Sequence, residues 1–184
     1  AHSATETVTV VGIDTPAASR FEFDGVDVIS VDPPPGLDSV PDFIGDLVVE
    51  RRLARAVRRR APDADIIHAH HRRGTFALSH IDSDCPTVGT VRDFWPICPI
   101  SIYHVDGEQC TGCDDRLDDC LAYQGWDGMS EPARKYYLLA KRTHNRRGFV
   151  PDHAVFIADH LRRRVAESIT TPPSSVIYNP VSID

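Results

Sequence analysis

Residues 88–99 read VGTVRDFWPICP, a short apolar run that passes directly into charged and aromatic side chains. The apolar residues over 86–91 predict a buried strand. The cluster Arg92-Asp93-Phe94-Trp95-Pro96 begins where that strand ends. In an open parallel sheet, ligands bind beyond the carboxyl ends of the strands. This stretch therefore predicts a central strand and a functional edge beside it.

The rest of the chain alternates between apolar runs and helical patterns, which is typical of an α/β fold. We expect a Rossmann-like parallel sheet flanked by helices, with a cysteine-rich loop insert. Gly148 is predicted to cap a helix, and Glu50 interrupts the apolar stripe of another, which predicts a bend or a late start. The expected strands are 8–12, 26–31, 65–70, 86–91, 153–157 and 175–178, and the expected helices are 43–60, 74–81, 131–147 and 159–168.

The overall charge bears on the class of partner. The 184 residues carry a formal net charge of −7, so the chain lacks the basic surface of a general nucleic-acid binder. No apolar run approaches the roughly 20 residues that span a bilayer, and we expect a cytoplasmic protein. Arginine outnumbers lysine and aspartate outnumbers glutamate. This halophile-like composition suits a salt-rich cell or, equally, an arginine-rich codon usage.

Four of the five cysteines fall within the segment 97–129. They are Cys98, Cys110, Cys113 and Cys120, and the middle two form a C-x-x-C pair, a common half of a tetrahedral zinc site. A long insert with little apolar material would be fixed by such a cross-link. A structural four-thiolate zinc ion is therefore the first expectation. Disulfides, which a cytosolic protein seldom keeps, an iron–sulfur cluster of uncommon spacing and free thiols remain alternatives.

Five segments follow one another along the chain: ETVTVVG at 6–12, DADIIHAHH at 63–71, VGTVRDFWPICP at 88–99, VFIADHLRRRV at 155–165 and VIYNPVSID at 176–184. In this order they resemble the N-terminal domain of family 4 glycosyltransferases, which are retaining enzymes of the GT-B fold. Two positions depart from the family's usual pattern: Arg92 stands where many relatives carry histidine, and Asp159 stands where serine is usual.

This resemblance implies a nucleotide-sugar donor and a glycan, lipid-linked or protein-linked acceptor. It also implies that the donor site lies in a C-terminal domain after residue 184, and that a first strand and a glycine-rich loop precede residue 8. We therefore expect residues 1–184 to form one acceptor-side domain of a hexosyltransferase-type enzyme, with 97–129 as an insert. By itself this segment is expected to be inactive.

The residues that follow the strands suit such a reaction. Arg92 can bind a phosphate or carboxylate in a forked geometry, Asp93 can accept a hydrogen bond from a sugar hydroxyl, and Trp95 offers an apolar face to a sugar ring. His70 or His71 can bind an acceptor hydroxyl or assist proton transfer. The structural alternatives, which stay open, are an Arg–Asp ion pair, an indole that fills the core edge, and packed histidines. Residues 158–160 and Asn179 also follow predicted strands, so they are further candidates for the site at the carboxyl ends of the strands.

The helix expected over 131–147 is rich in basic residues beside tyrosines and leucines. Such a helix can lie on an anionic membrane surface or face a lipid-linked acceptor, so peripheral membrane contact is one interpretation. An ordinary surface helix with one apolar face is the favoured alternative. The basic residues are Arg134, Lys135, Lys141, Arg142, Arg146 and Arg147.

Two other classes of function compete with the transferase. A metal-stabilised binding or regulatory domain would bind zinc tightly and need no nucleotide sugar. A lobe of a dinucleotide-dependent oxidoreductase would need the motif G-x-G-x-x-G after a strand. No predicted strand in this chain is followed by that motif, so this alternative has the weaker support.

Overall fold

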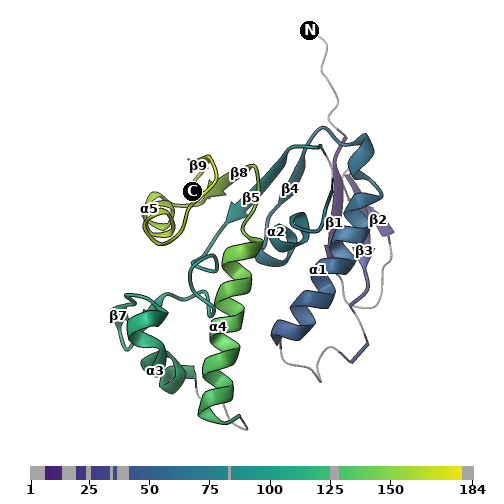
Figure 1. The fold of residues 1–184 in the computed structure, drawn as a ribbon. Helices are drawn as coiled ribbons and strands as arrows, with labels where there is room; N and C mark the ends of the chain where they lie inside the picture. The colour runs from purple at the N-terminus through teal and green to yellow at the C-terminus, as the bar shows by residue number, and fades with distance from the viewer. Residues whose placement is uncertain are drawn as a thin grey trace, which may run out of the picture.

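The protein is an α/β structure built on two main sheets (Figure 1). The computed structural model describes residues 7–13, 20–23, 26–33, 35–36, 42–82, 84–124 and 129–179. The larger sheet is parallel throughout, and the smaller one pairs β1 in parallel with β3 and β2 antiparallel to β3. The predicted α/β fold with a parallel sheet is therefore confirmed. The larger sheet has the order β4 (Ile67–Ala69), β5 (Thr87–Val91), β8 (His153–Phe156), β9 (Ser174–Val176), and the smaller has β1 (Thr9–Ile13), β3 (Val26–Val31), β2 (Arg20–Phe23).

Four helices form where the sequence predicts them. They are α1 (Asp42–Arg58), α2 (Arg72–Leu78), α4 (Glu131–Gly148) and α5 (Asp159–Ser168), and the 3-10 turn η2 (Ala61–Asp63) follows the first of them. Strand β2 has no counterpart among the strands expected from the sequence. The segment 97–129 is expected to be irregular, but it contains β6 (His104–Val105), β7 (Glu108–Gln109) and the helix α3 (Cys113–Gln124). The predictions that concern residues 1–6, 125–128 and 180–184 lie outside the described residues.

A small apolar core joins α1 to the smaller sheet. Val49, Leu53 and Ala54 on one face of α1 pack together with Ala77 of α2. The partly buried side chains of Val11, Ile13, Val31 and Ile81 close this core. Because α2 also packs on β4 and β5, α1 and α2 together link the two sheets.

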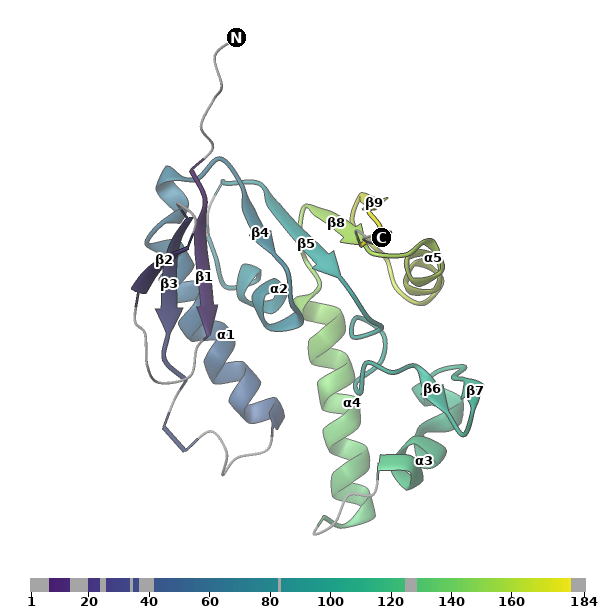
Figure 2. The ribbon, with the colours of Figure 1, turned by 180° about the vertical axis from the view of Figure 1, so that it is seen from behind.

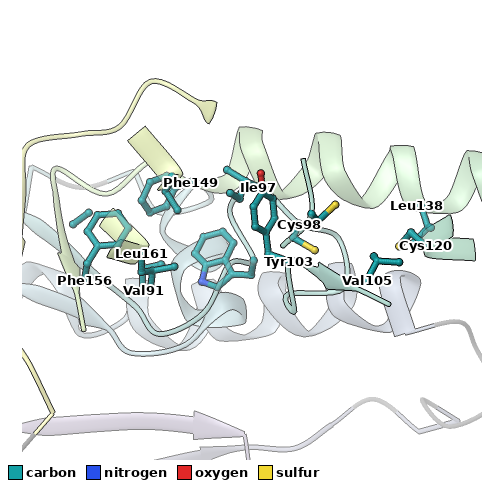
Figure 3. Packing of buried hydrophobic residues seen from close by; sticks show 14 of the residues in the cluster. Val91, Ile97, Cys98, Tyr103, Val105, Cys120, Leu138, Phe149, Phe156 and Leu161 are labelled. Atoms are coloured by element: carbon teal, nitrogen blue, oxygen red, sulfur yellow. The ribbon is translucent and has the colours of Figure 1, made fainter. Parts of the chain in front are cut away.

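The larger core lies over the parallel sheet and continues into the insert. Figure 3 shows Val91, Phe156 and Leu161 close to Phe149, with Tyr103, Cys98 and Cys120 farther along the same cluster. Burial of these side chains provides most of the favourable free energy that holds the elements together. The insert therefore shares the domain's core instead of forming a loose loop.

Glu50 does not bend or shorten α1, contrary to the expectation from its place on the apolar stripe. Its side chain is completely buried, and both carboxylate oxygens lie 3.0 Å from Nε2 of His144 on α4. A buried carboxylate needs such a partner, because an unpaired charge in the interior is costly. Glu50 thus connects α1 to α4 through the core.

Gly148 is not a helix cap, so that prediction is wrong. It is the last residue of α4, Phe149 occupies the C-cap position, and Gly148 is not among the described residues with a positive φ. An added Cβ would overlap Cδ1 of Phe76 and lie 3.0 Å from its Cε1. The glycine is required because α4 passes close to the Phe76 ring.

Gly148→Ala is therefore expected to lower the free energy of unfolding by about 1–3 kcal/mol, the usual cost of overpacking a core. Gly74→Ala in α2 is the matched control, because its added Cβ would lie 3.5 Å from Cβ of Ala69, an ordinary contact. That control is expected to be neutral or stabilising by up to about 1 kcal/mol, since alanine favours helices. Chemical denaturation measures both, and equal stability of the two variants would contradict the close approach.

Candidate functional site

The carboxyl ends of the parallel strands gather most of the predicted site residues at one edge. Because β4, β5 and β8 are neighbours (Figure 2), the residues that follow them stand in the same order along this edge. His71 lies within electrostatic range of Asp93. His71 and Asp93 thus lie near each other, with His70 and Arg92 beside them in the chain, and we call these four residues the edge cluster.

His71 caps helix α2. Its Nδ1 accepts a hydrogen bond from the backbone N–H of Arg73 at 3.3 Å. Burial, followed by the charges of Arg72 and Arg73, lowers the pKa of His71, while Asp93 and Asp46 act in the opposite direction. A low pKa favours the neutral ring, which the cap requires because a protonated Nδ1 cannot accept a hydrogen bond. His71 is exposed, so it is hydrogen-bonded as a cap but not packed in the core.

His70 is exposed and lies against a second histidine. The ring centroids of His70 and His68 are 3.9 Å apart, and Nε2 of His68 lies 2.8 Å from Oγ1 of Thr90. Burial and the neighbouring His70 lower the pKa of His68. This tilted ring contact holds the exposed His70 ring at the carboxyl end of β4.

An ion-pair cluster fixes the start of α2, directly after His71. The sequence patterns do not predict this cluster. Asp46 of α1 is only 2% exposed and binds both arginines at the start of α2. Nε of Arg73 lies 2.6 Å from Oδ1, and Nη2 of Arg72 contacts Oδ2. One sequence feature could have predicted it. Asp46 and Glu50 are four residues apart, so they put two acids on the apolar face of a helix that is otherwise basic.

Arg92 and Asp93 are both exposed where β5 ends. Oδ1 of Asp93 accepts a hydrogen bond from the backbone N–H of Trp95 at 2.8 Å, which fixes the turn after the strand. The described part of the chain contains no ion pair to Arg92. The expected alternative of an Arg92–Asp93 ion pair is thus not seen among these residues, and the guanidinium faces solvent.

Trp95 lies in the core and offers no exposed face to a sugar. Its side chain is 2% exposed and packs edge-on against Phe76 at 4.9 Å and Phe149 at 5.4 Å between ring centroids. The interpretation of this indole as a surface for a sugar ring is therefore wrong. Trp95 instead fills the edge of the core, as the structural alternative holds. The physical reason is that the chain turns inward directly after Asp93.

The pattern of nearly the whole chain matches that of a known family. Residues 2–181 match the family described as glycosyl transferase 4-like domain. The chain belongs to this family. Membership confirms the resemblance carried by the five segments and implies a nucleotide-sugar donor and an acceptor substrate. A comparison with curated proteins found no match.

The four insert cysteines of this glycosyltransferase domain line one small cavity. The cavity has a volume of about 10 Å³, room for about one water molecule. Burial raises the pKa of Cys98, and it raises the pKa of Cys113 to about 11 and that of Cys120 to about 12. Cys98, Cys110, Cys113 and Cys120 form no disulfide with one another, and within the described residues no three potential metal ligands are already grouped around one point. The zinc site therefore stays a prediction.

The basic helix of the glycosyltransferase domain holds the insert. Arg142 of α4 binds Asp114 of α3 with two hydrogen bonds of 2.8 Å. Lys135 of α4 lies 2.7 Å from Oδ1 of Asp118. These two cations therefore pair with the insert, in agreement with the interpretation of α4 as an ordinary surface helix. Within the described residues, no helix is long and apolar enough to cross a bilayer.

A polar cavity of about 270 Å³ lies between the insert, α4 and α5. Arg142, Arg146 and Arg164 line it. Asp114 pairs with the first of these arginines and Glu167 with the last. Burial, and next the neighbouring Arg142, lowers the pKa of Arg146. The cavity lining holds these three arginines against two carboxylates, Asp114 and Glu167, and so has an excess of positive charge. An anionic group of suitable size would reduce this repulsion.

Proposed function

We propose that this chain is the acceptor-side domain of a hexosyltransferase that moves a sugar from a nucleotide-sugar donor to a glycan, lipid-linked or protein-linked acceptor. The observation that carries the proposal is the pair of exposed side chains Arg92 and Asp93 at the carboxyl edge of the parallel sheet, where open α/β sheets bind ligands. The donor-binding residues would lie in a second domain, so this segment alone would be inactive.

The edge cluster has the groups that the reaction needs. Sugar transfer requires that the departing phosphate is stabilised while an acceptor hydroxyl attacks, and preorganised cations meet this need. Arg92 would bind a phosphate or an acidic acceptor group with its forked N–H donors. Asp93 uses Oδ1 in the turn to Trp95, so its Oδ2 would accept a hydrogen bond from the acceptor.

The arginine-lined cavity favours an acceptor with a phosphate. Lipid-linked sugars carry such a group, and a cavity with three guanidinium groups would suit it. The free thiols of the insert fit a reducing compartment. We therefore place the transfer in the cytoplasm or at the inner face of the membrane.

Arg92→Ala in the intact protein is expected to lower kcat/KM for sugar transfer about tenfold or more, equivalent to about 1.4 kcal/mol of lost transition-state stabilisation. Arg92→Lys is expected to restore only part of the rate, because an ammonium group lacks the forked geometry. Transfer from a panel of nucleotide sugars, with circular dichroism to monitor folding, measures both effects.

Arg59→Ala is the matched control for this substitution. Arg59 is equally exposed but precedes β4, so it lies toward the amino ends of the strands. This variant is expected to keep the full transfer rate. If Arg92→Ala transfers sugar as fast as Arg59→Ala, the edge cluster does not contact the reacting groups.

A further inference from the structure

Four thiols from three separate segments converge inside the insert. Cys98 lies in the turn after β5, Cys110 follows β7, and the other two belong to α3. Cys113 and Cys120 lie on either side of the kink at Arg116 in α3. All four line the same small cavity.

A backbone N–H group is directed at one of these sulfurs. The N–H of Gly112 donates to Sγ of Cys110 at 3.4 Å, and Gly112 has a φ of +131°, which favours glycine. This hydrogen bond fixes the loop between Cys110 and Cys113, and metal ligands are commonly oriented by such contacts.

Two cations lie beside the thiols. Arg116 lines the cavity, and Arg142 lies within electrostatic range of Cys113. Four thiolates around a divalent ion leave an excess of negative charge, which these guanidinium groups would offset. The cavity is also lined by the apolar side chains of Ile97 and Val105 and by Tyr103 and His104.

We propose that Cys98, Cys110, Cys113 and Cys120 bind one zinc ion in a tetrahedral four-thiolate site. Zinc prefers this ligand set, and four protein ligands leave no open position for catalysis. The four cysteines already line one cavity, and binding would require their side chains to turn toward its centre, because no three potential ligands of the described residues are yet grouped there. The ion fixes the β6–β7 hairpin and α3 to the turn after β5, and so stabilises the insert beside α4.

The metal content of the intact protein tests this proposal without any need for transfer activity. Protein purified in reducing buffer without chelators is expected to contain about one zinc per chain. Replacement by cobalt is expected to give the visible absorption bands of a tetrahedral thiolate complex. Folded protein that contains iron instead, or no metal with four titratable thiols or disulfides, would overturn the zinc site.

Matched cysteine variants assign the ligands. Cys110→Ser and Cys113→Ser are expected to lose the zinc, whereas Cys85→Ser, whose thiol contacts Ala64 far from the cavity, is expected to keep it. If the ligand variants do not fold, a thiol-blocking reagent is applied to the unchanged protein. It is expected to release the zinc and to lower the Tm of the protein. Zinc that stays bound after all four thiols are blocked would exclude these ligands.

Discussion

His144→Ala is expected to lower the free energy of unfolding by about 3–5 kcal/mol, because it leaves a buried carboxylate without its partner. Nε2 of His144 lies 3.0 Å from both carboxylate oxygens of Glu50, whose side chain is completely buried. The His144 ring also packs against Phe76 at 4.7 Å between centroids. Urea denaturation followed by circular dichroism measures the loss.

A double substitution separates the pair from general packing. Glu50→Met with His144→Leu removes both polar partners and is expected to lose clearly less stability than His144→Ala, because apolar groups can replace a buried ion pair at little cost. His104→Ala changes an exposed histidine and is expected to stay within about 0.5 kcal/mol. If the double variant is the least stable of the three, the buried pair is not what stabilises this contact.

The local patterns in the sequence predict the strands and the edge of the sheet, but they do not predict its long-range pairs. Residues after β4 and β5 meet at one edge because parallel strands align their carboxyl ends. By contrast, Glu50 and His144 are 94 positions apart, and Asp46 is 26 positions from Arg72. The spacing of residues within one helix does not show which residue of another helix they contact. Both pairs therefore appear only in the folded chain.

The same limit explains the errors at Gly148 and Trp95. A glycine at a helix end usually relieves a positive φ, whereas here the deciding contact is the ring of Phe76 from another helix. An indole after a strand at the functional edge suggests a ligand platform, but the turn made by Asp93 directs it inward. In both cases a neighbour from a distant part of the chain determines what the residue does.

Trp95→Ala is expected to lower the free energy of unfolding by about 3–5 kcal/mol, the usual loss for a large aromatic side chain removed from a core. The indole is 2% exposed and lies between Phe76 and Phe149. Its backbone carbonyl accepts a 2.7 Å hydrogen bond from Nδ2 of the buried Asn145, so Trp95 anchors the turn that carries Arg92. Thermal and chemical unfolding of the intact protein measure the loss.

Trp95→Phe distinguishes a core residue from a sugar contact. A phenyl ring keeps part of the packing, so this variant is expected to lose less stability than Trp95→Ala while KM for the acceptor stays unchanged. An indole that stacks on the sugar would give the opposite pattern, because its smaller replacement would raise KM at nearly full stability. Unchanged KM in Trp95→Phe, together with a lowered rate in Arg92→Ala, would mean that the buried indole only positions the turn, whereas the exposed guanidinium meets the substrate.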